Sequence, residues 1–267
     1  MNLLLLNPSE IDAEHRTVRL SDRRARHLRS VLRAEPGRVV KVGVTDGRVG
    51  TAAVLGSSTS SVLLELDLTG RAPEPPDVHL VLAVPRPKVL SRILQAAAAM
   101  GVRRIDLVNA WRVEKGYFQS PKLTQEAIMA DLRFGAEQGR SPWLPTVQVH
   151  RYFVRFVEEC LPPILTGWPA LRLVAHPGSL LPVEQVALDR GAAPAVVAIG
   201  PEGGFIEAEL ESFVARGFVA VTVSERVLRV ETAVAAVLSQ LELIRRLWSA
   251  KPRGREPTLN YPARPGG

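Results

Sequence analysis

The sequence predicts an α/β protein with a small β-rich N-terminal part and a larger C-terminal part built on a parallel sheet. From residue 37 to residue 68 the apolar residues recur with a period of two, which is typical of short antiparallel strands. Residues 70–76 then contain three prolines within four positions, a composition that suits neither a helix interior nor a sheet interior. After this linker, strand-like and helix-like segments alternate, which is the pattern of a parallel sheet covered by helices.

The N-terminal part is expected to form a small barrel of strands together with one helix. The apolar run at residues 3–6 predicts a first strand, because it is too short for a signal peptide and meets Asn7-Pro8 at once. Residues 20–22 predict a helix start with Ser21 as the N-cap. Further strands are expected at residues 39–42, 49–55 and 62–68, with a turn at Thr45-Asp-Gly47.

The helix that follows Ser21 carries the densest concentration of positive charge in the sequence. Its arginines are interleaved with apolar residues that fall on one face. A solvated basic helix face is one interpretation, but the local excess of charge is unbalanced until Glu35, which favours contacts with nucleic-acid phosphates. We therefore expect RNA contacts from Arg23, Arg26, Arg29 and Arg33.

The C-terminal domain is expected to span residues 77–250, after an N-terminal domain of residues 1–72. Gly101 and Gly217 are expected to end helices in the left-handed conformation. The predicted strands are residues 78–84, 105–108, 171–175, 195–199 and 219–223, and the predicted helices are residues 89–100, 152–161, 207–216 and a long segment ending near Trp248. Residues 251–267 lack periodicity and are rich in proline, glycine and basic residues, which predicts a flexible basic tail.

The composition of the 267 residues limits the classes of function. With 46% hydrophobic residues the chain can bury a substantial core, and 34 Lys and Arg against 27 Asp and Glu give a net charge of +7. That excess suits a polyanionic partner, or serves solubility alone. The single cysteine, Cys160, excludes an internal disulfide and predicts a reducing cytoplasm. Because the five histidines lack ligand spacing and no apolar run could cross a bilayer, we expect neither a metal nor a membrane partner.

Two polar loops at the ends of predicted strands are the candidate site. Residues 195–199 lead into Gly200-Pro-Glu-Gly-Gly-Phe205, and residues 219–223 lead into a loop at residues 224–233. Ligands of open α/β sheets bind at such carboxyl ends. The first loop lacks the dinucleotide fingerprint and no Gly-Lys-Ser/Thr follows it, so it suits an adenine or ribose edge better than a triphosphate. Taken alone, its glycines are equally typical of a tight strand-to-helix turn.

Together, the two loops resemble the paired signature of SPOUT-class methyltransferases of the RsmE type, which modify N3 of a uridine in 16S (small-subunit) ribosomal RNA. The resemblance extends to the basic helix, to Glu137-Gln138, and to Pro145 eight positions after that glutamate. It implies a trefoil-knotted α/β domain that binds S-adenosylmethionine, a PUA-like RNA-binding barrel before it, and a homodimer. Two features depart from the family: Pro85-Arg-Pro-Lys88 replaces a Lys-Gly-Asp-like helix start, and the expected RNA-binding arginine, Arg140, lies one place early.

The resemblance assigns roles to individual residues. Arg229 is expected to stabilise the uridine N3 anion, while Glu202 or Glu231 accepts the proton or orients Arg229. Alternatively, Arg229 and Glu231 form an ion pair that fixes the loop to the last helix. His176 is expected to lie on a third wall of the pocket without a catalytic role, because a lone histidine at a strand end is more often structural. The residues expected to hold S-adenosylmethionine are Ala175, Ile199, Gly200, Pro201, Gly203, Val223, Val227, Leu228 and Ala233.

Alternatives stay open for one further loop and for the function. The loop at residues 112–119 suits stacking on a splayed-out base, or is a surface loop with two packing aromatics. A non-catalytic RNA-binding protein would explain the basic helix and tail, but not the two elaborate strand-end loops. A SPOUT methyltransferase acting on transfer RNA would share the pocket and differ in its N-terminal domain. The loop residues concerned are Arg112, Lys115, Tyr117, Phe118 and Gln119.

Overall fold

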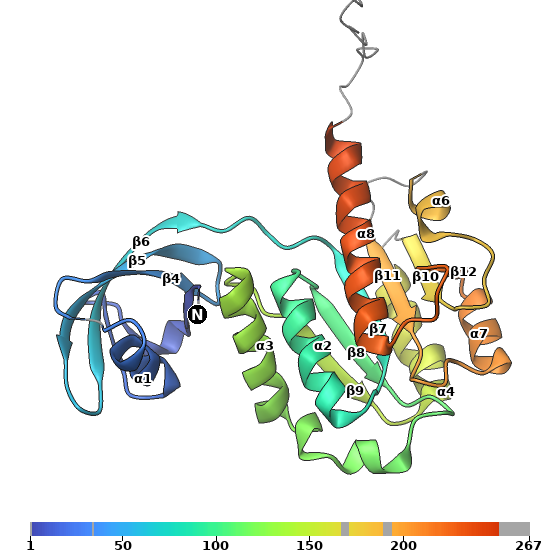
Figure 1. Cartoon of the computed structure of the whole chain (residues 1–267), viewed down its shortest axis with the longest axis horizontal. Helices are drawn as coiled ribbons and strands as arrows, with labels where there is room; N and C mark the ends of the chain where they lie inside the picture. Colours follow the sequence, from blue (N-terminus) through green and yellow to red (C-terminus); the bar gives the residue numbers. More distant parts are fainter. Residues whose placement is uncertain (1, 34, 167–170, 189–193, 251–267) are drawn as a thin grey trace, which may run out of the picture.

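The protein has two sheets, each with its own hydrophobic core, joined by the proline-rich linker (Figure 1). The computed structural model describes residues 2–33, 35–166, 171–188 and 194–250. The predicted basic tail at residues 251–267 therefore lies outside the described residues. In Figure 1 the N-terminal sheet lies on the left, and the C-terminal sheet with its helices lies on the right.

The N-terminal sheet is a mixed sheet with the order β1-β4-β5-β6-β3-β2. The predicted antiparallel pairing is confirmed for β4, β5 and β6, whereas β1 lies parallel to β4. Both faces of β1 are buried, with Leu4 and Leu6 in the N-terminal core and Leu5 in the C-terminal core. The predicted barrel is not confirmed, since β1 and β2 are the edges of the sheet. The strands are β1 (Leu4–Leu6), β2 (Ile11–Asp12), β3 (Thr17–Leu20), β4 (Val39–Val44), β5 (Arg48–Ser57) and β6 (Val62–Arg71).

The basic helix α1 (Arg23–Ser30) differs from the prediction at both ends. Its N-cap is Asp22 and not Ser21, because the Asp22 carboxylate accepts a hydrogen bond from the backbone N–H of Arg24 at 2.8 Å. The helix ends at Ser30, and Arg33 lies beyond it in the left-handed conformation with φ of 47°. Arg33 is therefore not on the helix, contrary to the prediction.

The C-terminal sheet confirms the predicted parallel α/β arrangement. Its order is β12-β10-β11-β7-β8-β9, and every pairing is parallel. The sequence analysis missed β9, an edge strand whose side chains are mostly exposed and therefore give no clear apolar pattern. The strands are β7 (Val78–Ala83), β8 (Arg104–Val108), β9 (Thr146–His150), β10 (Leu171–Ala175), β11 (Ala195–Ile199) and β12 (Val219–Val221).

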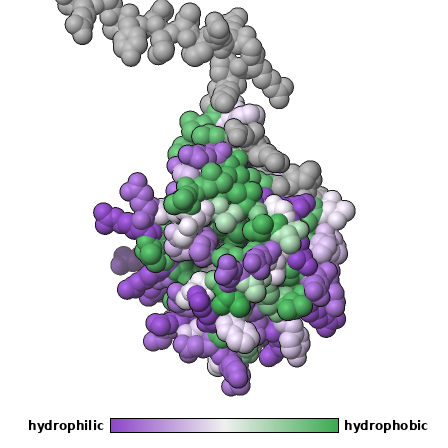
Figure 2. Space-filling view, turned by 90° about the vertical axis from the view of Figure 1, so that its right-hand side faces the viewer, coloured by the Kyte–Doolittle hydropathy of each residue, from purple (hydrophilic) through white to green (hydrophobic). Residues whose placement is uncertain are grey.

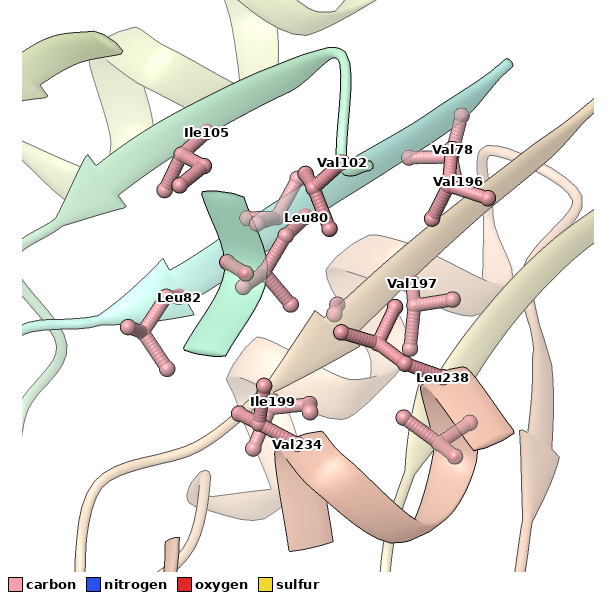
Figure 3. Packing of buried hydrophobic residues seen from close by; sticks show 14 of the residues in the cluster. Val78, Leu80, Leu82, Val102, Ile105, Val196, Val197, Ile199, Val234 and Leu238 are labelled. Atoms are coloured by element: carbon pink, nitrogen blue, oxygen red, sulfur yellow. The ribbon is translucent and has the colours of Figure 1, made fainter. Parts of the chain in front are cut away.

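Helices pack against the C-terminal sheet and position its loops. Helix α2 packs against both α3 and α8, and Val234 and Leu238 of α8 lie close to Ile199 and Val197 of β11 (Figure 3). The α-helices are α2 (Pro87–Ala99), α3 (Gln125–Gly139), α4 (Phe153–Arg155), α5 (Leu161–Thr166), α6 (Val183–Ala187), α7 (Glu207–Val214) and α8 (Val230–Ala250). Shorter turns are η1 (Pro8–Glu10), η2 (Lys115–Gln119), η3 (Pro121–Leu123) and the π-helical η4 (Phe156–Cys160).

The continuous helix predicted at residues 152–161 is wrong in form. The chain instead forms one turn of α4, the π-helical η4 and then α5. Pro162 and Pro163 have no N–H groups with which to bond the carbonyls four residues earlier, so an α-helix cannot run regularly into them. The wider turn of η4 precedes these prolines.

The two parts meet at a junction between α1, β1 and α3, which we call the α1–α3 junction. The backbone N–H groups of Asn2 and Leu3 donate to the carbonyl oxygen of Glu137 at 3.2 and 3.1 Å. Arg23 donates two hydrogen bonds to the Glu137 carboxylate, at 2.9 and 3.0 Å. Burial of Glu137, only 1% exposed, raises the pKa of its carboxyl group even though Arg23 opposes the rise.

Arg24 is a buried residue on the N-terminal side of this junction, and its contacts lie within the N-terminal part. The residue is 6% exposed, and its guanidinium group donates to the carbonyl oxygen of Leu5 at 2.8 Å. It also forms ion pairs with Glu10 at 2.6 Å and with Asp22 at 2.8 Å. The hydrogen bond from Arg24 lowers the pKa of the Glu10 carboxyl group below its ordinary value. Arg24 is therefore a structural arginine.

A buried carboxylate joins β7, β8 and β9, at the β9 edge of the C-terminal sheet. The Asp106 carboxylate on β8 accepts hydrogen bonds from Nε2 of His79 at 2.5 Å, from Nε2 of His150 at 2.6 Å and from Nε of Arg104 at 2.7 Å. Burial disfavours the charge on Asp106, but these hydrogen bonds outweigh the burial and hold the pKa of its carboxyl group well below its ordinary value. The network fixes His150, the last residue of β9.

Candidate functional site

A cleft of about 490 Å³ opens where β10, β11 and β12 end, and we call it the carboxyl-edge cleft. It is lined by four segments that are far apart in the sequence: the start of α2, the loop after β10, the glycine-rich loop after β11, and the loop between β12 and α8. The strands are parallel, so their carboxyl ends meet at one edge of the sheet. The two loops singled out from the sequence therefore face a single cleft.

The glycine-rich loop turns tightly at the end of β11. Gly204 adopts the left-handed conformation with φ of 73°, and its N–H donates to the carbonyl oxygen of Pro201 at 2.8 Å. A Cβ atom on Gly200 would lie 2.8 Å from the backbone nitrogen of Phe205, so a side chain there would force the turn apart. Phe205 itself is buried beside Phe213 and anchors the loop. The turn thus holds its backbone in place along the cleft.

Residues 222–229, the arginine turn, form the opposite wall. Gln240 of α8 donates from its amide to the carbonyl oxygen of Val223 at 3.0 Å, and Thr222 Oγ1 donates to the carbonyl oxygen of Ser224 at 2.8 Å. In the part of the chain that the structure describes, the side chains of Arg226 and Arg229 have no hydrogen-bond or ion-pair partner. The alternative ion pair between Arg229 and its neighbouring glutamate is thus not formed. Both arginines are exposed and line the cleft.

The loop after β10 is the third wall, as predicted. The backbone N–H of His176 donates to the carbonyl oxygen of Val221 at 2.9 Å, which ties this loop to β12. The ring Nδ1 of His176 accepts a hydrogen bond from the N–H of Gly178 at 3.1 Å. With Nδ1 acting as an acceptor, the neutral ring carries its proton on Nε2. These contacts support the structural role expected for His176.

The start of α2 closes the remaining side of the cleft. Arg86 is the N-cap of α2, and its backbone N–H donates to Glu202 Oε1 at 3.1 Å. The Arg86 guanidinium group lies 3.9 Å from the same oxygen. Apolar surface comes from Val89, Ile199 and Leu228, which also line the cleft. The cleft therefore combines apolar walls with backbone polar groups and charges of both signs, which suits a ligand with a flat apolar part and a polar edge.

The structure brings together nearly all residues that the sequence analysis placed in the site. The three expected catalytic residues, Glu202, Arg229 and Glu231, line the cleft. Gly203 does not line the cleft, but its neighbour Gly204 does. The Gly203 carbonyl oxygen accepts a hydrogen bond from Arg112 at 2.5 Å. The expected cofactor-binding residues that line the cleft are Ala175, Ile199, Gly200, Pro201, Val223, Val227, Leu228 and Ala233.

The predicted RNA-binding arginines have different surroundings. Arg26 and Arg33 are exposed, and Arg140 is exposed as the left-handed C-cap of α3 with φ of 56°. Arg23 is engaged by the buried carboxylate of α3, although half of its side chain is exposed. Arg29 donates to two carbonyl oxygens in the loop between β5 and β6. Arg26 and Arg33 are thus the residues of α1 and its C-terminal extension most available to a partner.

Two cationic residues of the cleft were not assigned a role from the sequence. Arg226 lies within the quoted loop but received no role, and Arg86 was noted only for its departure from the family. The rule that ligands bind at the carboxyl ends of parallel strands was the available signal, because Arg86 follows shortly after β7. Applied to every strand and not only to two, that rule identifies this wall as well.

In the loop after β8, the two aromatic residues named from the sequence fit the packing alternative, whereas Arg112, Lys115 and Gln119 are exposed. Tyr117 and Phe118 are partly buried and pack against the C-terminal core. Among the described residues, no group of three or more His, Cys, Asp or Glu side chains is placed to hold a metal ion. No helix in the described ranges is both long and apolar enough to cross a lipid bilayer.

Comparison with known proteins identifies the family of this chain. A profile of the family described as RNA methyltransferase domain matches residues 72–242, more than half of the chain. Ribosomal RNA small subunit methyltransferase E of Treponema pallidum is 28% identical over 259 residues, which cover 94% of each chain. The protein of the same name from Synechocystis is 28% identical over 232 residues, covering 85% of this chain and 73% of the relative.

Two solved structures support the fold. A methyltransferase from Legionella pneumophila, determined with bound S-adenosylmethionine, has a TM-score of 0.76 at 22% identity and covers 91% of this chain and 97% of its own. Ribosomal RNA small subunit methyltransferase E from Neisseria gonorrhoeae, bound to S-adenosylmethionine, has a TM-score of 0.72 with the same identity and coverage. The resemblance to RsmE-type methyltransferases is thus confirmed, and the chain belongs to the RNA methyltransferase domain family.

Proposed function

We propose that this protein transfers a methyl group from S-adenosylmethionine to N3 of a uridine in 16S (small-subunit) ribosomal RNA. The observation that carries the proposal is the single cleft formed by the Gly200 turn and the arginine turn at the carboxyl edge of the sheet. Support comes from the relatives named Ribosomal RNA small subunit methyltransferase E, and from the bound S-adenosylmethionine in the Legionella and Neisseria structures.

The residues of the cleft fit S-adenosylmethionine. Its volume of about 490 Å³ lies within the range of roughly 300–1,000 Å³ typical of small-molecule sites. Ile199 and Leu228 offer apolar surface to an adenine ring, and the backbone at Gly200 and Val223 offers donors and acceptors to its edge and to the ribose. When bound, S-adenosylmethionine supplies a methyl group activated by its sulfonium.

The chain's own groups would prepare the uridine. N3 must lose its proton during transfer, and Arg229 would stabilise the resulting negative charge on N3 or on a neighbouring carbonyl oxygen. Glu202 or Glu231 would accept the proton or orient Arg229, because both carboxylates line the same cleft. Since N3 lies on the pairing edge of the base, the uridine must be unpaired or flipped out when it enters.

The proposal extends to the organisation of the molecule. Residues 1–72 would form a PUA-like RNA-binding domain with contacts from Arg23, Arg26, Arg29, Arg33 and Arg140, and residues 77–250 a SPOUT domain with a trefoil knot. The protein would act as a homodimer in the cytoplasm. Figure 2 supports a dimer, because hydrophobic residues gather from the top to the centre of this face of the molecule. Leu180 and Val227 also stay 98% and 82% exposed.

Two measurements test the proposal. Calorimetry with S-adenosylmethionine should detect binding, whereas a non-catalytic RNA-binding protein would give no heat of interaction. Mass spectrometry of ribosomal and transfer RNA from a deletion strain should then show 3-methyluridine missing from small-subunit ribosomal RNA. A methyl group lost from transfer RNA instead would support the second candidate, a SPOUT methyltransferase with another substrate.

A further inference from the structure

Two large aromatic side chains are exposed at the carboxyl edge of the C-terminal sheet, beside the cleft. Trp111, in the loop after β8, is 79% exposed, and Tyr152, in the loop after β9, is 70% exposed. An exposed tryptophan does not gain the favourable free energy of burying its large apolar side chain. Aromatic residues are also enriched at binding interfaces. Neither side chain contributes to the C-terminal core, unlike Tyr117 and Phe118.

The loop that carries Trp111 is hydrogen-bonded to α7 and to the glycine-rich loop of the cleft. The backbone N–H of Trp111 donates to Glu209 Oε1 at 2.8 Å, while Glu209 Oε2 accepts from the N–H of Ile206 at 3.0 Å. Glu209 is 5% exposed, so this carboxylate is a buried support and not a surface group. Arg112 then donates to the carbonyl oxygen of Gly203, next to the cleft. Trp111 is therefore exposed on a fixed backbone.

The loop that carries Tyr152 is joined to the first loop. The backbone N–H of Asn109 donates to the carbonyl oxygen of His150 at 3.0 Å, and the Asn109 side chain donates to the carbonyl oxygen of Arg151 at 3.1 Å. The guanidinium group of Arg151 lies 5.9 Å from the centre of the Phe118 ring. The two exposed aromatics thus belong to one connected surface, which we call the aromatic platform, and Figure 1 shows its β8–α3 segment along the lower edge of the sheet.

The charge around the platform is positive. Residues 109–124 contain three basic residues, Arg112, Lys115 and Lys122, against one acidic residue, Glu114. Residues 150–159 contain two arginines and two glutamates. Arg155 pairs with Glu159 at 2.8 Å, so Arg151 is the cation that this segment offers beside Tyr152. Exposed aromatic faces among cations are the combination that binds single-stranded nucleic acid, because bases stack on the rings and phosphates pair with the cations.

We propose that Trp111 and Tyr152 stack on unpaired bases of a single-stranded RNA, next to the nucleotide that enters the cleft. The proposal takes from the proposed function only the nature of the ligand, RNA. In the order β11-β7-β8-β9, the two loops start two and three strands from the glycine-rich loop, roughly 10 and 14 Å at the spacing of parallel strands. Roughly three to four stacked nucleotides, at about 3.4 Å each, span that distance.

The test is binding of a fluorescently labelled oligouridine to Trp111→Ala and Tyr152→Ala, followed by fluorescence anisotropy. Base stacking on one aromatic residue corresponds to an affinity loss on the order of tenfold for each alanine variant. Trp111→Phe, which keeps a ring, should stay close to the wild type. The fluorescence of Trp111, isolated as the difference between the wild type and Trp111→Phe, should be quenched when oligouridine binds.

Phe134→Ala is the matched control, because Phe134 is an exposed aromatic on α3, outside the platform. It should leave the affinity unchanged, and thermal melts should show all variants folded. Wild-type affinity in Trp111→Ala, or an equal loss in Trp111→Phe or Phe134→Ala, would overturn the proposal. So would a change of oligomeric state in Trp111→Ala with RNA affinity retained. Calorimetry with S-adenosylmethionine tests the proposed function separately, so its failure can be distinguished from failure of the stacking proposal.

Discussion

The arginines of the α1–α3 junction and the two arginines of the arginine turn differ in what surrounds them. At the junction, Arg24 is buried and bound to two carboxylates and a carbonyl oxygen, and Arg23 pairs with the buried Glu137. At the cleft, Arg226 and Arg229 are exposed and have no hydrogen-bond or ion-pair partner among the described residues. Arg24 is therefore committed to the fold, whereas Arg226 and Arg229 are available to a ligand.

The density of positive charge in a sequence therefore does not show which arginines are free to bind a ligand. The most arginine-rich stretch of this chain supplies the buried structural Arg24 and the half-exposed Arg23, alongside exposed Arg26. Arg229, in a loop with only one other arginine, lies where the chemistry is expected. The partners of each guanidinium group, and not the number of arginines, separate the two roles.

The largest effect should come from Arg229→Ala. Removing one group aimed at developing charge typically lowers turnover by about 100- to 1,000-fold. Affinity for S-adenosylmethionine should stay within about twofold, because the backbone and apolar walls of the cleft are unchanged, and the free energy of unfolding should not fall. Turnover of methyl groups into RNA, with calorimetry in parallel, measures both. Wild-type turnover would remove Arg229 from the mechanism.

Arg24→Ala should show the opposite pattern. Loss of the buried guanidinium group leaves Glu10 and the carbonyl oxygen of Leu5 without their partner, which costs about 3 kcal/mol in the free energy of unfolding. Urea denaturation measures this loss. Once folded, the variant should bind S-adenosylmethionine as tightly as the wild type. A variant of undiminished stability would show that the junction is not held by Arg24.

Replacing Arg26, Arg29 and Arg33 together with alanine should weaken RNA binding and flatten its dependence on salt. Each lost phosphate contact lowers the salt slope by about one. We expect a change smaller than three, because Arg29 already donates to carbonyl oxygens of the protein. Arg92→Ala, an exposed arginine on α2, is the control. Equal slopes for the triple variant and the wild type would leave α1 as ordinary surface.

The smallest effect is a dependence of stability on pH at the junction. Arg24 lowers the folded-state pKa of Glu10 below its value in the unfolded chain, about 4.3. The unfolded chain therefore binds the proton first as the pH falls, so the stability that the pair contributes is complete at neutral pH and is lost below about pH 4. Urea denaturation between pH 7 and pH 3 should show a steeper loss for the wild type than for Arg24→Ala. Equal pH dependence of the free energy of unfolding in the two proteins would show that Arg24 does not lower the pKa of Glu10.

Much of the C-terminal domain could be predicted because its buried strands are continuous apolar runs. The run at residues 195–199, followed by a glycine-rich loop, predicts both a strand and a site at its end. The edge strand β9 could not be found this way, since its side chains are mostly exposed. Neither could the parallel pairing of β1, because it depends on the C-terminal core that buries Leu5.

The candidate site divides in the same way. The two loops could be located because both follow strands of one parallel sheet, so topology alone brings them together. Arg86 could not be placed in the site from the sequence, because its position depends on where α2 begins relative to the cleft. The burial of the aromatic residues could not be predicted from residue type alone: Tyr117 and Phe118 pack inward, while Trp111 is exposed.

The central claim is that the carboxyl-edge cleft positions S-adenosylmethionine and a uridine for transfer to N3. The most direct measurement is nucleoside analysis by mass spectrometry of small-subunit ribosomal RNA incubated with the protein and methyl-labelled S-adenosylmethionine. We expect label in 3-methyluridine with the wild type, and about 100- to 1,000-fold slower labelling with Arg229→Ala. Label in another nucleoside, or unlabelled RNA from a wild-type protein that binds S-adenosylmethionine, would contradict it.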